Sequence, residues 1–321
     1  MRAVLFAFVV ASCLTACVDT PPPVDASEAP TDASIETTDM PATLSLLTWN
    51  DLLSRDRPAP TTSIRIGDGD TDIVDLWLPE TPGPHPVVLM VHGGCWQKAI
   101  ADRTLMNYAA EDLRQRGLAV WNIEYRGVDE TGGGYPGTYL DVARAADALR
   151  DQAERYDLDP NRVAGIGHSA GGHLVTWLAT RAALPDTSPL DNADPLSLLG
   201  VINSGGLADL EVSVNVTQYD CLGAIIDDLI GSPSDARENA FSDTSPAELL
   251  PVPGTFVSIS GAMDRISPPG LADEIAAKDR AANGSGQSII VAGNNHVDLI
   301  APGTEAWEVQ AALLQDMLAP R

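Results

Sequence analysis

Residues 163–174 read VAGIGHSAGGHL, an apolar run that leads into the pattern Gly-x-Ser-x-Gly at 167–171. The run favours a strand and the residues after it favour a helix, so the pattern predicts a strand, a sharp turn and a helix. Gly167 and Gly171 flank the serine because a Cβ on either side would clash in so tight a turn. The turn would lift the Ser169 hydroxyl above the sheet, where the dipole of the following helix favours negative charge. Ser169 is the candidate nucleophile.

Strand-like and helix-like segments alternate around this turn. Apolar runs predict strands at 73–78, 86–91, 118–125, 162–167, 198–202, 255–260 and 288–291. Helical spacing predicts helices at 102–116, 138–156, 170–181, 268–282 and 304–318. This order predicts the α/β class, with a mostly parallel central sheet and helices on both faces. Residues 206–253 break the rhythm, and we expect them to form a small cap insertion over the carboxyl edge of the sheet.

A second glycine-rich turn, His92-Gly93-Gly94, ends the strand predicted at 86–91. Glycines let the backbone approach a reacting oxygen closely, and their N–H groups can stabilise an oxyanion. Together with the turn at Ser169, this pattern predicts an oxyanion hole made by the amides of Gly93, Gly94 and Ala170. An ordinary Gly-Gly turn is the alternative.

A serine nucleophile needs a base and an acid that orients the base. The chain has five histidines, and His296 is the one that follows the last predicted strand, in the order Ser, Asp, His expected after a Gly-x-Ser-x-Gly turn. Asp264 follows the strand at 255–260 and is the candidate acid. Asp298 is its rival, but its closeness to His296 in sequence favours a local hydrogen bond.

Several other residues carry open predictions. Trp96 and Tyr135 could line a substrate pocket or simply pack their loops. Cys95 and Cys221 could form a disulfide, although sequence alone cannot give their separation. The cysteines and histidines show no clustered metal-ligand spacing, so we expect no metal and no cofactor.

The N-terminus has the pattern of an export signal. Arg2 precedes an apolar stretch at 3–11 that is too short to span a bilayer, and Leu14-Thr15-Ala16-Cys17 resembles the lipobox of bacterial lipoproteins. We therefore expect a signal peptide at 1–16 and lipid on Cys17, with an ordinary secretory signal as the alternative. Residues 17–43 hold six acidic residues and no base, which predicts a disordered tether. The expected location is the cell envelope, at the outer membrane if the source is Gram-negative.

The net negative charge of the chain limits which molecules it can bind. The chain has 19 basic and 45 acidic residues, a net charge of −26. Such a chain repels phosphate backbones, which excludes nucleic acid as a partner and leaves the lipid anchor as the route to a membrane. A neutral or cationic substrate would approach Ser169 more readily than an anionic one, unless Arg126 or Arg265 supplies local positive charge.

The stretches HGGCWQ (92–97), GHSAGGHL (167–174), SGAMDRISPP (260–269) and NNHVDLI (294–300) resemble the α/β-hydrolase superfamily. More narrowly, the chain is similar to esterases that include kynurenine formamidases and feruloyl-esterase-like proteins. The resemblance covers about 45–318 and implies a catalytic domain at 44–321 with the triad Ser169, Asp264 and His296. It implies a serine esterase acting on a small-molecule ester. An arylformamidase acting on an amide is the alternative, a non-catalytic envelope binding protein or a peptidase is more remote, and the oligomeric state stays open.

Overall fold

The computed structural model describes residues 46–216 and 221–320. The predicted signal peptide at 1–16, the lipid site Cys17 and the tether at 17–43 lie outside these residues. Within them, no helix is both long and apolar enough to cross a bilayer.

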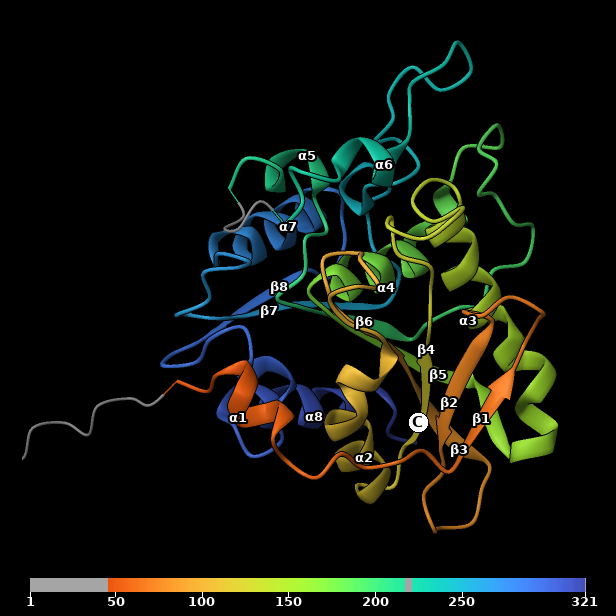
Figure 1. The fold of residues 1–321 in the computed structure, drawn as a ribbon, viewed down its shortest axis with the longest axis vertical. Coiled ribbons are helices and arrows are strands. Elements are labelled where there is room, and N and C mark those ends of the chain that lie inside the picture. Colours follow the sequence, from red (N-terminus) through yellow and green to blue (C-terminus); the bar gives the residue numbers. More distant parts are fainter. Residues whose placement is uncertain (1–45, 217–220, 321) are drawn as a thin grey trace, which may run out of the picture. The chain divides into compact units, whose positions relative to one another are not determined.

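An eight-stranded sheet forms the centre of the fold, in the spatial order β1-β2-β4-β3-β5-β6-β7-β8 (Figure 1). Strands β2 and β1 are antiparallel to their neighbours, and all the other pairs are parallel. The mostly parallel sheet predicted from the sequence is therefore confirmed. The strands are β1 (Thr62–Arg65), β2 (Ile73–Trp77), β3 (His85–Val91), β4 (Ala119–Ile123), β5 (Leu158–His168), β6 (Gly200–Ser204), β7 (Thr255–Gly261) and β8 (Gln287–Val291).

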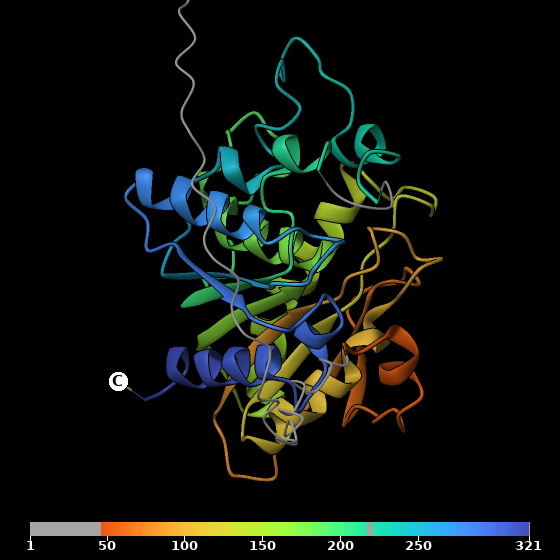
Figure 2. The same ribbon diagram turned by 90° about the vertical axis from the view of Figure 1, so that its left-hand side faces the viewer.

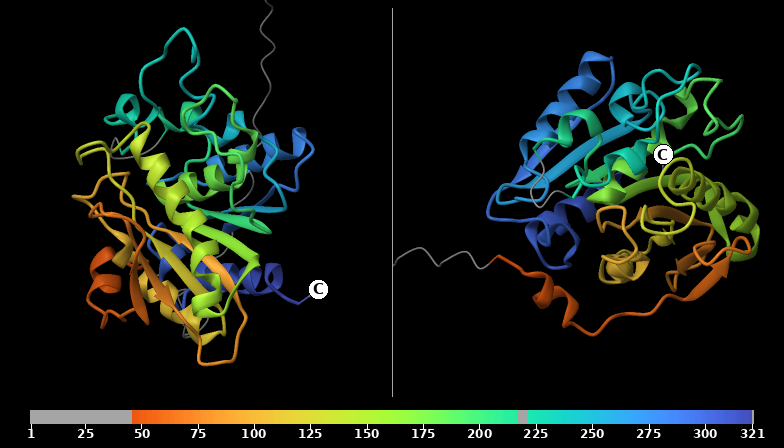
Figure 3. Two further views of the ribbon diagram at one scale, coloured as in Figure 1. Left: turned by 90° about the vertical axis from the view of Figure 1, so that its right-hand side faces the viewer. Right: turned by 45° about the horizontal axis from the view of Figure 1, so that its top comes forward.

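Helices cover both faces of the sheet. The α-helices are α1 (Trp49–Leu53), α2 (Asn107–Gln115), α3 (Gly137–Tyr156), α4 (Ala170–Thr180), α5 (Leu210–Ser213), α6 (Ile226–Ile230), α7 (Gly270–Ala281) and α8 (Glu305–Met317). Short 3-10 turns are η1 (Arg103–Met106), η2 (Arg181–Ala183), η4 (Pro246–Glu248) and η5 (Asp298–Ile300). Figure 2 shows α7 and α8 on opposite sides of the strands, and Figure 3 shows α3 lying along the sheet.

Alternation along β3 divides the core into two layers. Val87, Leu89 and Val91 belong to a buried cluster shared with α3, α4 and α7. Val88 and Met90, which point the other way, belong to a second cluster shared with α1, α2 and α8. Successive side chains of a strand face opposite sides of the sheet, so a continuous apolar strand can fill both layers.

The insertion predicted at 206–253 lies between β6 and β7 and carries α5, α6 and η4. It packs over α4 on the face opposite α1 and α2 (Figure 1). Two side chains of α4 donate hydrogen bonds to carbonyls of the insertion: His173 Nε2 to Thr244 O and Trp177 Nε1 to Asp243 O, both at 2.8 Å. The insertion therefore covers α4, and a disulfide between Cys95 and Cys221 also joins it to the loop after β3, at the carboxyl edge of the sheet.

His173 should make the fold sensitive to acid. Burial lowers the pKa of His173 to about 4, a shift that its hydrogen bond to the Thr244 carbonyl only partly opposes. Between pH 6.5 and about 4 the unfolded chain therefore binds a proton that the folded chain does not. The free energy of unfolding should fall by about 1.4 kcal/mol per pH unit in this window on account of this residue.

Urea denaturation between pH 7 and 4.5 measures this dependence. His173→Gln should reduce the slope of the free energy of unfolding against pH by the share of one proton, about 1.4 kcal/mol per pH unit. The other titrating groups contribute equally in both proteins. Equal slopes in the two proteins would contradict the assignment.

Candidate active site

Ser169 occupies a strained turn between β5 and α4. Its backbone φ is 55° and ψ is −120°, a conformation that few residues other than glycine adopt. A Cβ on Gly171 would lie 2.2 Å from the Val91 carbonyl oxygen, and one on Gly167 would lie 2.0 Å from the Gly171 carbonyl oxygen. The turn thus needs glycine at both flanking positions, as the sequence pattern predicts.

Three backbone amides near Ser169 are the candidates for an oxyanion hole. The amide of Ala170 lies at the N-terminus of α4, and the amides of Gly93 and Gly94 lie in the loop after β3. Within residues 46–216 and 221–320, none of these three amides donates a hydrogen bond to the protein. Gly94 has a φ of 118°, which favours glycine there. Free donors beside a nucleophile are what an oxyanion hole requires.

His296 and Asp264 are paired and buried. His296 Nδ1 donates to Asp264 Oδ2 at 2.7 Å. The other carboxylate oxygen of Asp264 accepts from the backbone amides of Ile266 and Ser267, each at 2.9 Å. These bonds fix the carboxylate, which in turn keeps the proton of His296 on Nδ1 and leaves Nε2 as an acceptor. Asp298, the rival acid, instead accepts from the Asn295 amide.

His168 supports the loop that carries His296, a role that the sequence analysis did not assign. Its Nε2 donates to the His296 carbonyl at 3.0 Å, and the two ring centroids lie 4.4 Å apart. Burial and the nearby His296 hold the pKa of His168 well below its ordinary value. A neutral His168 adds no positive charge beside His296.

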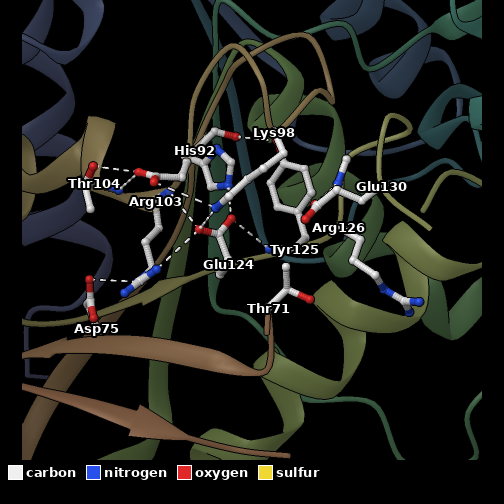
Figure 4. Close-up of polar contacts among 12 residues, drawn as sticks. Thr71, Asp75, His92, Lys98, Arg103, Thr104, Glu124, Tyr125, Arg126 and Glu130 are labelled. Carbon is white, nitrogen blue, oxygen red and sulfur yellow. Dashed lines mark hydrogen bonds and ion pairs between the residues drawn. The ribbon is translucent and has the colours of Figure 1, made fainter. Parts of the chain in front are cut away.

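A buried ion cluster lies behind the glycine turn at 92–94 (Figure 4). The Glu124 carboxylate accepts from His92 Nε2 at 2.8 Å, from Lys98 Nζ at 2.8 Å and from Arg103 Nη1 at 3.4 Å. His92 Nδ1 contacts the Gly93 carbonyl, and Tyr125 stacks on the His92 ring. Burial alone would raise the pKa of Glu124, but His92 and Lys98 hold that pKa far below its ordinary value. The cluster thus anchors the loop that presents Gly93 and Gly94.

A disulfide joins Cys95 to Cys221, with Cα atoms 5.4 Å apart. Cys95 follows the Gly93-Gly94 turn directly, and Cys221 belongs to the insertion between β6 and β7. The bond therefore fastens the loop of the candidate oxyanion hole to a segment 126 residues further along the chain.

Ser169 and His296 open into one cavity of about 310 Å³. Gly94 and Cys95 border it on one side, and α1 contributes Trp49. The remaining lining residues are Leu53, Ile100, Ala101, Leu105, His168 and Ile266. The wall is mostly apolar, and of the residues that the structure describes, α1 contributes Trp49 and Leu53 whereas the insertion contributes none.

Trp96 and Tyr135, the pocket residues suggested by the sequence, do not line this cavity. Trp96 has a φ of 55°, which turns its ring into the core, where it is fully buried and donates to His173 Nδ1 at 3.1 Å. Tyr135 lies beside Arg237, whose guanidinium is 3.9 Å from the centre of the ring, and borders a separate cavity with Asp243. Both side chains pack their loops. The aromatic side chain that lines the cavity with Ser169 is Trp49.

Two further observations concern charge at the site. Arg126 is paired with Asp141 at 2.7 Å, whereas Arg265 is exposed and lines a cavity next to His296. Within the part of the chain that the structure describes, no three His, Cys, Asp or Glu residues are placed to hold a metal ion.

The parallel sheet, the strained serine turn and the His–Asp pair after β7 and β8 define an α/β-hydrolase fold. The sequence agrees, because residues 74–278 match the model of the BD-FAE family. This chain belongs to the BD-FAE family. The matched region contains Ser169 and Asp264 and ends before His296.

Several named relatives of this chain are esterases. Esterase LipC of Mycobacterium tuberculosis is 26% identical over 209 residues, which cover 63% of this chain and 50% of that protein. An acetylxylan esterase of Xylanibacter ruminicola is 32% identical over 114 residues, or 35% of this chain and 22% of that protein. The chain spans half or less of the length of these relatives.

Solved structures share the fold at low identity. A truncated carbohydrate esterase from gut microbiota has a TM-score of 0.67 at 19% identity, covering 82% of this chain and 98% of that one. Esterase 2 of Thermogutta terrifontis has a TM-score of 0.66 at 17% identity, covering 83% and 98%.

Removing the Glu124 carboxylate should destabilise the protein. Glu124→Ala leaves His92, Lys98 and Arg103 facing a buried gap, and the loss of one member of a buried ion cluster costs about 3–5 kcal/mol. Denaturant unfolding followed by tryptophan fluorescence measures this loss. Glu111→Ala, which breaks the more exposed pair with Arg114, is the control and should cost less than about 1 kcal/mol. Similar losses in the two variants would contradict the assigned role of the cluster.

Proposed function

We propose that this chain is a serine carboxylesterase with the triad Ser169, His296 and Asp264. The observation that carries the proposal is the hydrogen bond from His296 to the buried Asp264, together with the cavity that His296 lines with Ser169 and Gly94. The esterase names of the relatives support the same reaction class.

The first half of the reaction begins at Ser169. His296 Nε2 accepts the Ser169 proton while the hydroxyl oxygen attacks the ester carbonyl, and Asp264 stabilises the imidazolium that forms. The negative charge on the carbonyl oxygen then lies against the amides of Gly93, Gly94 and Ala170. Each such donor lowers the barrier by about 3–4 kcal/mol.

Collapse of the tetrahedral intermediate breaks the ester bond. His296 returns its proton to the leaving alkoxide, and the acyl group stays on Ser169. Water then enters, His296 removes its proton, and the second tetrahedral intermediate releases the acid and the free enzyme. The oxyanion forms next to the backbone amides and the imidazolium next to Asp264. Because these groups are already in place, the protein needs little rearrangement during the reaction.

Replacing the nucleophile is the decisive test. Ser169→Ala should lower kcat for p-nitrophenyl acetate by about 10⁴- to 10⁶-fold, because the remaining groups cannot form an acyl-enzyme. Unfolding curves should show that the variant keeps its fold. Ser242→Ala, a hydroxyl outside the cavity, is the matched control and should keep full activity.

A fluorophosphonate probe followed by peptide mass spectrometry should place its adduct on Ser169. Turnover by Ser169→Ala at more than a hundredth of the wild-type rate would refute the triad. A wild-type kcat/KM that is higher on N-formylkynurenine than on every ester tried would replace the esterase with an arylformamidase. Absence of both turnover and labelling would leave a non-catalytic binding protein.

We also propose that the chain is an exported lipoprotein anchored through Cys17. The lipobox-like sequence at 14–17 is the support, and the Cys95–Cys221 disulfide fits an oxidising compartment. Two or more acyl chains would hold the protein firmly at a membrane, since each buried CH₂ contributes about 0.8 kcal/mol.

Metabolic labelling with a clickable fatty acid tests the anchor. Wild-type protein should be labelled and sediment with membranes, whereas Cys17→Ser should be unlabelled. Cys13→Ser is the control, because that residue would leave with the signal peptide. A wild-type protein without label would disprove the anchor without affecting the proposed reaction.

A further inference from the structure

A second cavity adjoins the one that contains Ser169. It has a volume of about 640 Å³ and shares three lining residues with the first: Trp49, Ile266 and His296. Ser169 and Gly94 border the first cavity but not the second. The three shared residues therefore form a partition, with the nucleophile on one side and His296 accessible from both.

The chemistry of the site assigns a substrate portion to each side. The ester carbonyl must lie against Ser169 and the amide of Gly94, which places the acyl group in the first cavity. The leaving alkoxide takes its proton from His296, so the alcohol portion must pass His296 toward the second cavity. We refer to the two as the acyl cavity and the alcohol cavity.

The linings of the two cavities differ in polarity and size. The acyl cavity is bordered mainly by apolar side chains such as Leu53, Ile100 and Leu105, and its volume is at the low end for small-molecule sites. The alcohol cavity is about twice as large, and its lining adds Thr48, Arg265 and Asn295 to apolar residues such as Leu47 and Met263. A short apolar acid and a larger alcohol that carries both apolar and polar groups fit this pair.

Trp49 is held in place at the partition. Thr48 and Asp51 form a capping box that starts α1, and Leu52 anchors the helix in the core. Asn295, on the loop that carries His296, donates to the Leu47 carbonyl at 2.8 Å. The indole meets the rings of His168 and His296 edge-on, with centroids 6.2 and 6.3 Å away.

We propose that Trp49 is a specificity-determining residue that closes the acyl cavity and so limits the enzyme to esters of short apolar acids. The proposal rests on the esterase function above. Without the indole, the two cavities would join, and a longer acyl chain could extend into the alcohol cavity.

The test measures kcat/KM on p-nitrophenyl acetate, butyrate, hexanoate and octanoate. In the wild-type protein kcat/KM should fall steeply beyond butyrate. Trp49→Ala should raise the octanoate-to-acetate ratio of kcat/KM at least 10-fold, and Trp49→Leu, which keeps an apolar contact for the helix, should raise it in the same direction. Trp49→Phe keeps an aromatic wall and should retain most of the wild-type preference.

Asn50→Ala, an exposed neighbour on the same helix, is the matched control and should leave the ratio unchanged. If Trp49→Ala and Trp49→Leu both keep the wild-type ratio within 2-fold while the wild-type protein cleaves esters, the role of Trp49 is refuted and the esterase function stands. If the wild-type protein cleaves none of the four esters and does not label at Ser169, the esterase function and the role of Trp49 fall together. A ratio that rises equally in Asn50→Ala would assign the effect to loosening of α1 and refute a specific role for the indole.

Discussion

The close approach of helix α4 to the ends of β3 and β5 is the constraint on which the site depends. Gly167 and Gly171 leave no space for a Cβ, and this lack of space holds Ser169 in its strained conformation. The same contact sets the Ala170 amide beside the loop after β3 and aims the dipole of α4 at the serine oxygen. The remaining parts of the site are loops at the carboxyl ends of parallel strands, which meet at this edge.

Each of these loops has its own anchor. Glu124 holds the glycine turn through His92, backbone amides hold Asp264, and His168 holds the loop of His296. The anchors differ in physical kind, since one is a buried ion cluster and the others are hydrogen bonds to backbone. Geometry near Ser169 is thus maintained by groups other than Ser169 and His296 themselves, a common requirement for a site that must be organised before the substrate arrives.

The sheet and the residues around Ser169 could be predicted because their signals are local: a Gly-x-Ser-x-Gly pattern, apolar runs and strand ends. Strand β1 was missed since its four residues carry too short a pattern. Trp49 was missed because its role comes from a contact with residues more than 100 positions away, although the capping box of Thr48 and Asp51 signals α1. The two interpretations of Trp96, pocket lining or loop packing, could not be separated from the sequence, because its burial depends on a loop conformation with a positive φ that sequence seldom reveals for tryptophan.

The disulfide also lowers the conformational entropy of the unfolded chain. Closing a loop of 126 residues removes conformational freedom from the unfolded ensemble, which in the chain-entropy model stabilises the native state by about 4–5 kcal/mol. As long as the disulfide is intact, the glycine turn and the insertion stay close together even in the denatured protein. The folding chain therefore does not have to bring these two segments together again. A chain produced under reducing conditions lacks the disulfide and this constraint. Its refolding yield would depend on the redox potential of the buffer as much as on temperature or denaturant.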